Sequence, residues 1–197
     1  MSNVACKKKE WKIYLGRIPH NKTGTFWVSF ESDPRLSRNK ANIYGRCLPC
    51  IRNLYHQLAD GRTVIDLGTA FSCWKITAML EDLDQCLELL SEFENRFPGG
   101  HVYGKLGSGR ASATTKVVVF HADQETERDR LKAALEQCIA GMALEAEVLI
   151  SRGCAILYEP ILGDWRGWKA STPVRFPERV PGHLQRLKRI MATGKMK

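Results

Sequence analysis

The sequence predicts an α+β protein in which strands and helices follow the order β-α-β-β-α-β through the centre of the chain. Three observations support this prediction. The composition, 44% hydrophobic and 26% charged residues, is that of an ordinary globular protein that can bury a core. Short segments alternate apolar and polar residues, and the segments between them repeat apolar residues every three or four positions. The length of 197 residues suits one compact domain or two small units that share a core.

The N-terminal part is expected to form a β-hairpin followed by a helix. Residues 11–15 and 24–31 both alternate as strands do, and the second segment (GTFWVSFE) is rich in aromatic and β-branched residues. Residues 19–23 (PHNKT) between them have turn chemistry. A helix is predicted over residues 48–59, where apolar residues have the spacing of one helix face and a turn-forming Asp-Gly pair follows.

The centre of the chain contains the alternating elements. Asp82 and Gln85 have the spacing of a capping box at the start of one helix, and Asp123 is expected to cap another helix with two glutamates in its first turn. The last strand is expected to bend at Gly153. The predicted strands cover residues 63–67, 74–80, 101–107, 115–121 and 147–158, and the predicted helices cover residues 82–97 and 123–141.

From residue 74 onward this order is that of the split βαβ unit in ferredoxin-like folds. Two helices there cover one face of a four-stranded antiparallel sheet, and the other face is free to meet a ligand or a partner. We therefore expect three parts. They are a basic N-terminal hairpin and helix packed on the core (residues 1–62), a ferredoxin-like α+β core (residues 63–161), and a basic extension with tryptophans, prolines and a short helix at residues 182–191 (residues 162–197).

Positive charge is concentrated at the two ends of the chain. The formal net charge is +9, but residues 1–62 contain 12 basic and 4 acidic residues, residues 63–161 contain 9 and 15, and residues 162–197 contain 9 and 2. Basic flanks can neutralise phosphates and release condensed counterions, so this asymmetry favours a polyanionic partner such as nucleic acid. The other interpretation is that the basic ends pack against the acidic centre and neutralise it.

A short N-terminal segment points more narrowly to RNA. Residues 12–19 (KIYLGRIP) resemble the first ribonucleoprotein strand of the RNA-recognition motif, and residues 24–30 (GTFWVSF) are similar to the second. The resemblance covers about twenty residues and implies that Tyr14, Phe26 and Phe30 stack on bases. That family places a helix and a strand between the two strands, whereas only a turn separates them here. The neighbouring cations are Lys12, Arg17 and Lys22.

Two loops add candidate contacts to nucleic acid. Residues 104–110 (GKLGSGR) are rich in glycine, so their amides can approach a phosphate, although the order of a Walker loop is absent. Residues 164–169 (DWRGWK) alternate tryptophan with positive charge, which suits either base stacking or buried rings that close the domain. The predicted nucleic-acid contacts are Lys12, Tyr14, Arg17, Lys22, Phe26, Lys105, Arg110, Trp165, Arg166, Trp168 and Lys169.

The seven cysteines, an odd number, are typical of a reducing cytosol. Cys47-Leu-Pro-Cys50 lies at the start of a predicted helix, where a C-x-x-C lowers the thiol pKa, so a thiol-redox protein using Cys47 and Cys50 is one alternative. A zinc site would need two more ligands, and Cys6, His56 and Cys73 are the nearest candidates. Because a second C-x-x-C and a histidine pair are both absent, we expect no metal and no cofactor.

The leading hypothesis is a nucleic-acid-binding protein, with RNA favoured, that acts as an RNA-processing or ribonucleoprotein subunit. The alternative from fold analogy is a ferredoxin-like regulatory module whose open sheet face dimerises or binds a metabolite or a protein. The five scattered histidines form no recognisable catalytic set, so the sequence assigns no enzymatic activity. Neither a secretory leader nor an apolar run long enough to span a bilayer is found, so we expect a cytoplasmic protein without a membrane partner.

Overall fold

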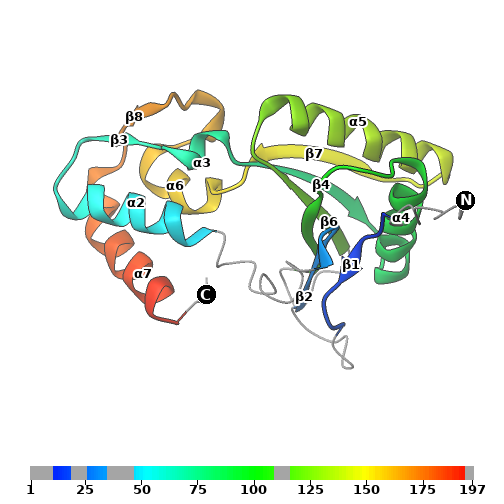
Figure 1. The fold of residues 1–197 in the computed structure, drawn as a ribbon. Helices are drawn as coiled ribbons and strands as arrows, with labels where there is room; N and C mark the ends of the chain where they lie inside the picture. The colour runs from blue at the N-terminus through cyan, green and yellow to red at the C-terminus, as the bar shows by residue number, and fades with distance from the viewer. Residues whose placement is uncertain (1–10, 19–25, 35–46, 109–115, 194–197) are drawn as a thin grey trace, which may run out of the picture.

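The computed structural model describes residues 11–18, 26–34, 47–108 and 116–193, and it confirms an α+β protein (Figure 1). Its main feature is an antiparallel sheet of six strands in the order β1-β2-β5-β6-β4-β7. β1 pairs with β2 as the predicted hairpin requires, whereas the predicted turn at residues 19–23 lies outside the described residues. The strands are β1 (Tyr14–Leu15), β2 (Phe26–Glu31), β4 (Trp74–Leu80), β5 (Tyr103–Ser108), β6 (Lys116–Ala122) and β7 (Glu147–Arg152).

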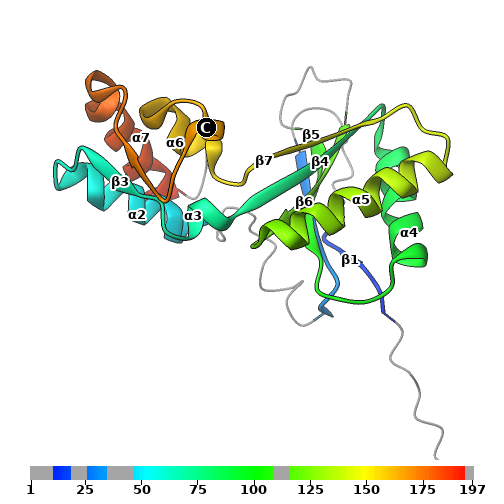
Figure 2. The ribbon, with the colours of Figure 1, turned by 90° about the horizontal axis from the view of Figure 1, so that it is seen from above.

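Two helices, α4 (Leu83–Arg96) and α5 (Glu125–Gly141), cover one face of this sheet (Figure 2). α4 begins as predicted, because the Asp82 side chain accepts a hydrogen bond from the Gln85 amide at 2.8 Å. The predicted cap of α5 is wrong: Gln124 is the N-cap, and the Asp123 carboxylate accepts a hydrogen bond from the Tyr103 hydroxyl instead. The hydrophobic cluster between helices and sheet includes Ile76, Phe93, Phe120 and Leu135.

The strand predicted over residues 147–158 is wrong in its second half. β7 ends at Arg152, and a turn at Gly153 leads into the helix α6 (Ala155–Leu162). The sequence could not separate the two possibilities, because a short apolar run fits a buried strand and a buried helix equally well. The buried residues of α6 have helical spacing and are Ala155, Leu157, Tyr158, Ile161 and Leu162.

A second group of elements packs beside the sheet around a hydrophobic cluster of its own (Figure 1). We name this group the small lobe. α2 has the bounds that the sequence predicts, and α7 extends the predicted C-terminal helix by two residues at each end. β3 and β8 pair as a two-stranded sheet. The small lobe consists of α2 (Leu48–Ala59), β3 (Val64–Asp66), α3 (Thr69–Ser72), α6, η2 (Trp165–Gly167), β8 (Ser171–Pro173), η3 (Pro177–Arg179) and α7 (Val180–Thr193).

The small lobe joins segments that lie far apart in the chain. Leu54 of α2, Ile65 of β3 and Leu187 of α7 belong to its single buried cluster. These residues come from all three parts of the division proposed from the sequence, and that division stays a prediction. The chain passes from the small lobe into the sheet at β4 and returns after β7, and the two crossings are adjacent because Trp74 pairs with Arg152.

Candidate functional site

One face of the sheet is not covered by α4 and α5, and we name it the open face. Side chains alternate along a strand, so Ile76 and Phe120 point to the helices while their neighbours Lys75 and His121 point to the opposite side. The strand register extends this face over all six strands. The open face contains Tyr14, Trp27, Lys75, Met79, Tyr103, Lys105, His121 and Leu149.

Three rings form a row on the open face. The rings of His101 and Tyr103 stack with centroids 5.2 Å apart, and those of Tyr103 and His121 stack with centroids 5.8 Å apart and planes inclined by only 8°. Lys75 pairs with His121 in the β4–β6 register, so a cation continues the row. Tyr103 and His121 are buried, with 7% and 9% of their surfaces exposed, whereas His101 at the end of the row is exposed.

Lys105 and Trp27 form a second contact between a cation and a ring on this face. The Nζ atom of Lys105 lies 4.0 Å from the centroid of the Trp27 ring. Gly107, opposite Trp27, allows β2 to approach closely, because a Cβ there would lie 2.3 Å from the Phe26 carbonyl oxygen. Burial, and secondly the charge of Lys75, lowers the pKa of Lys105 to about 8. No carboxylate of the described residues forms an ion pair with Lys105.

The aromatic residues of β2 point in opposite directions. Phe26 and Phe30 are buried in the cluster that faces the helices, with 9% and 2% of their surfaces exposed, whereas Trp27 between them lies on the open face. The stacking role implied for Phe26 and Phe30 does not fit this burial, because a ring inside the core has no free face for a base. Alternation alone left open which residues of this strand face the helices.

The two tryptophans of the predicted DWRGWK loop pack against other rings. Trp168 is buried in the small lobe, where its indole N–H donates to the Gly163 carbonyl at 3.0 Å and its ring lies against Tyr158. Trp165 is half-buried, and the centroid of its ring lies 5.9 Å from the centroid of the Trp74 ring. Trp74 belongs to the helix-facing side of β4, so this loop is not part of the open face.

The other predicted cations are spread over the molecule. Lys12 and Arg17 are exposed on either side of β1. Arg166 forms an exposed ion pair with Asp164 at 3.2 Å, and Lys169 is exposed beyond η2. The structure therefore does not gather them into one patch. Lys22 and Arg110 lie outside the described residues.

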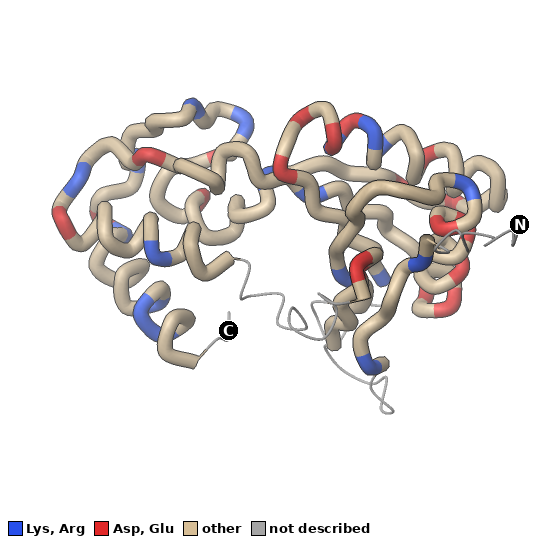
Figure 3. The backbone as a smooth tube through the Cα atoms, in the orientation of Figure 1, with Lys and Arg blue, Asp and Glu red and all other residues tan. Residues whose placement is uncertain are grey.

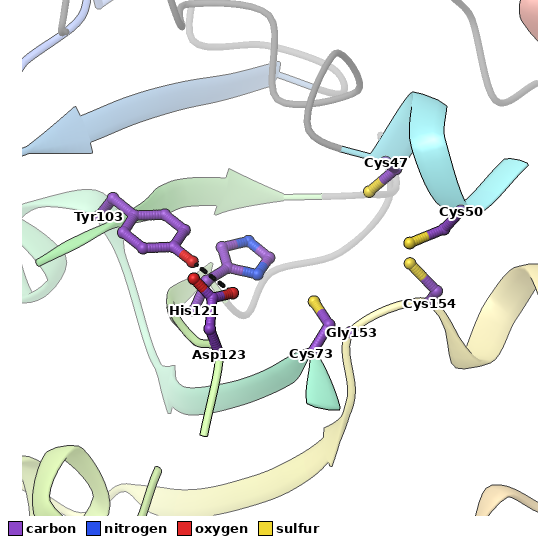
Figure 4. A pocket seen from close by; sticks show the side chains of 8 residues that line it. All are labelled: Cys47, Cys50, Cys73, Tyr103, His121, Asp123, Gly153 and Cys154. Atoms are coloured by element: carbon purple, nitrogen blue, oxygen red, sulfur yellow. Dashed lines mark hydrogen bonds between the residues drawn. The ribbon is translucent and has the colours of Figure 1, made fainter. Parts of the chain in front are cut away.

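A cavity of about 220 Å³ lies where the open face meets the small lobe (Figure 4). Four of the side chains around it are cysteines from three elements: Cys47 and Cys50 at the start of α2, Cys73 after α3, and Cys154 before α6. Cys50 and Cys154 meet in the buried cluster of the small lobe, and Cys47 packs against the same cluster. The other residues around the cavity are Tyr103, His121, Asp123 and Gly153.

The thiols in this cavity influence one another. The side chain of Cys154 interacts with those of Cys47, Cys50 and Cys73, and these contacts together with burial raise its pKa. The pKa of Cys50 is lowered to about 7, first by the hydrogen bond from Cys154 and further by a contact with the Thr69 hydroxyl at 3.6 Å, although burial opposes this shift. Of Cys50 and Cys154, Cys50 is therefore the thiol that loses its proton at the lower pH.

α2 and α7 form a basic side of the small lobe (Figure 3). The two helices pack against each other, and neither contains an aspartate or a glutamate. By contrast, α4 carries Asp84 and several glutamates on the sheet side of the molecule. The two surfaces therefore carry charge of opposite sign. The cations of α2 and α7 are Arg52, Arg186, Lys188 and Arg189.

Sequence reasoning missed several residues that the structure places in these sites. The alternation of β2 places Trp27 on the face opposite to Phe26 and Phe30, but it does not say which of the two faces is buried. No local signal connects Cys154 with the C-x-x-C of Cys47 and Cys50, because the two segments meet only in three dimensions. The remaining residues missed on the open face are Lys75, Tyr103 and His121.

Two kinds of site are not found in the described part of the chain. No helix there has both the length and the apolar character that crossing a membrane requires. No three or more His, Cys, Asp or Glu side chains there are placed so that they could hold a metal ion as they stand. Comparison with protein-family models, curated proteins and solved structures finds no match for this chain.

Proposed function

We propose that this protein binds single-stranded RNA on the open face of its sheet. The face presents the half-buried ring of Trp27 under Lys105, the exposed ring of His101, and the cation Lys75. Aromatic rings accept bases of any sequence by stacking, and lysines pair with the phosphates between them. The bases of a single strand are free to stack in this way, and proteins recognise RNA mostly in its single-stranded segments.

The arrangement of the sheet supports this proposal. We infer a ferredoxin-like unit from β4, α4, β5, β6, α5 and β7, because these elements have the sequence order β-α-β-β-α-β and the strand order β5-β6-β4-β7 with both helices on one face. Proteins that bind RNA on a four-stranded sheet use its uncovered face. A fold by itself carries no function, so RNA binding would depend on the side chains of that face.

The observation that carries the proposal is the position of Lys105. A lysine that is mostly removed from water, without a carboxylate partner among the described residues and beside another lysine, lowers the stability of the folded protein. A bound anion would supply the partner that this lysine lacks and would offset the cost of burying its charge. A phosphate group beside Lys105 would act as this partner.

The first test is direct binding of a fluorescently labelled single-stranded RNA of mixed sequence to the full chain. We expect the affinity to fall steeply with salt, with a slope of log affinity against log salt of about −2 if three cations contact phosphates. Fluorescence anisotropy at several salt concentrations measures this slope. Absence of binding at low salt, or binding that salt does not change, would contradict the proposal.

Replacing Trp27 by alanine is expected to weaken RNA binding by about 1–3 kcal/mol, because the base then loses its stacking surface. Phe176→Ala is the matched control: Phe176 is a half-buried ring with Arg179 at 4.1 Å from its centroid, and it lies in the small lobe away from the open face. We expect it to leave RNA affinity unchanged. Equal losses in the two variants would mean that the open face is not the RNA site.

RNA affinity should also decrease as the pH rises through about 8, the pKa of Lys105 in the free protein. Below that pH the ammonium group is protonated and attracts phosphate, and above it the group becomes neutral. Bound phosphate favours the charged form, so the midpoint measured in the complex lies higher than in the free protein. Anisotropy titrations between pH 7 and 9 should show this decrease in the wild type and not in Lys105→Met.

A protein partner on the open face is the second candidate function. Met79 and Leu149 are large apolar residues of this face with 37% and 42% of their surfaces exposed, and Leu149 lies on the edge strand β7. Sedimentation velocity separates the two candidates. A dimer that Leu149→Lys makes monomeric, in a chain that fails to bind RNA, would favour the dimerisation module.

A further inference from the structure

Cys47, Cys50, Cys73 and Cys154 direct four thiols toward one cavity between the sheet and the small lobe (Figure 4). Cys50 and Cys154 are buried, with 5% and 1% exposed, and the other two are half-buried. We propose that these four residues bind one zinc ion as thiolates, and that the ion fastens the small lobe to the sheet. This inference does not depend on the binding of RNA.

Zinc suits this set of ligands. A structural zinc site takes four tetrahedral ligands, and a C-x-x-C pair commonly supplies two of them. Here Cys47 and Cys50 are that pair, and Cys73 and Cys154 complete the set. On binding, four zinc–sulfur bonds form and the thiol protons pass to solvent, so no oxidant or reductant is needed.

The four cavity cysteines differ from the other buried cysteines in their surroundings. Cys86 and Cys138 lie in the hydrophobic cluster between the sheet and its helices. The side chain of Cys154, by contrast, interacts with those of Cys47, Cys50 and Cys73. These four thiols therefore form one group in space.

The number of thiols argues against a simple redox role. A dithiol that exchanges with a disulfide needs two cysteines, and the C-x-x-C pair would be sufficient. Cys154 interacts with both members of that pair and with Cys73 as well. Four thiols around one cavity are the number that a single tetrahedral ion requires.

Binding must draw the four sulfurs inward, because as they stand they could not hold an ion. Each cysteine can do so by rotating about its one side-chain torsion. Gly153 keeps the necessary space open: a Cβ at this position would lie 2.3 Å from the Sγ atom of Cys73. Glycine is therefore needed at position 153 because it leaves room for the sulfur of Cys73. Its own backbone conformation does not require it.

The ion would act at the junction of the two parts of the molecule. Cys73 immediately precedes β4 and Cys154 lies two residues after β7, so both crossings between small lobe and sheet carry a ligand. The Gly153 amide already donates to the Cys73 carbonyl at 2.7 Å, which holds the crossings together. Zinc would add the start of α2 to this junction through Cys47 and Cys50.

The test is the metal content of the full chain purified under a reductant and without a metal-affinity tag. We expect one zinc per chain by mass spectrometry, and replacement by Co²⁺ should give the absorption bands of tetrahedral cobalt thiolate. Cys154→Ser should lose the bound metal, whereas Cys138→Ser, a buried cysteine of the sheet cluster, should retain it. Retention of stoichiometric zinc by Cys154→Ser would overturn the proposal.

A second variant tests the site while keeping all four ligands. Gly153→Ala should weaken zinc binding by at least about tenfold, because the new methyl group displaces the Cys73 sulfur from its position. Gly182→Ala is the control, since a Cβ there meets nothing within 4 Å. Zinc affinity is measured by competition with a chromophoric chelator, so this variant decides the question even if Cys154→Ser fails to fold.

Three other outcomes would also overturn the zinc assignment. Iron together with inorganic sulfide in the purified protein would identify a cluster instead of a single ion. A metal-free protein whose Cys47 and Cys50 form a reversible disulfide would identify a thiol-redox site. Equal zinc affinity in Gly153→Ala and Gly182→Ala would show that Cys73 is not a ligand.

Discussion

Replacing Trp168 by alanine is expected to lower the free energy of unfolding by about 3–5 kcal/mol, a large share of the stability of a domain of this size. Only 7% of Trp168 is exposed, and its ring packs against Tyr158 in the cluster of the small lobe. Truncation leaves a cavity and removes the hydrogen bond from the indole to the Gly163 carbonyl. Urea unfolding followed by circular dichroism measures the change.

Trp165→Ala serves as the comparison within the same loop. Trp165 is half-buried between the two hydrophobic clusters, so its loss should cost about 1–2 kcal/mol of stability. Neither variant should change RNA affinity under conditions where the protein remains folded, because the loop lies away from the open face. If Trp165→Ala weakened RNA affinity tenfold and left the free energy of unfolding unchanged, this loop would be part of the RNA interface after all.

Lys105→Met is expected to raise stability and to weaken RNA binding by about tenfold or more. Methionine fills nearly the same volume without the cost of a half-desolvated charge, which should stabilise the protein by about 1–2 kcal/mol. The same change removes the cation that would meet a phosphate. Opposite signs in the two measurements are the signature of a residue kept for binding at the expense of stability.

The pH dependence of stability provides an independent check on Lys105. Its folded pKa of about 8 lies below its ordinary value of 10.5, so between these two values the unfolded chain holds a proton that the folded protein has lost. The free energy of unfolding of the wild type should therefore rise with pH over this range. That of Lys105→Met should not show this rise. Lys132→Met, which removes a lysine paired with Glu136 on α5, is the control for net charge and should retain the rise.

Local patterns predicted most of the secondary structure. α2 and α4 were recognisable because each has a stripe of apolar residues on one side, and in α4 the hydrogen bond from the Gln85 amide to Asp82 also marks the start. The boundary between β7 and α6 was not recognisable, because nearly every residue of that run is apolar. Where both sides of an element are buried, the periodicity that distinguishes a strand from a helix is lost.

The candidate site was predicted less well than the elements that carry it. Lys105 was predicted to contact nucleic acid because it lies in a glycine-rich segment, and it does lie on the open face. Phe26 was predicted to do so because it is aromatic, but it lies in the core. Trp168 was predicted to contact nucleic acid because two tryptophans in a polar loop had no obvious core in which to be buried. That core exists, and it is formed by α2, α6 and α7, which lie far apart in the chain.

The sequence by itself determined the α+β class, the positions of most helices and strands, and the concentration of positive charge at both ends of the chain, because periodicity, capping and composition are local properties. The tertiary structure decided which face of the sheet stays open, that Trp168 is buried, and that Cys73 and Cys154 reach the C-x-x-C of α2. These outcomes depend on strand order and on the packing of the small lobe against the sheet. Both are set by contacts between distant residues, about which a linear pattern contains no information.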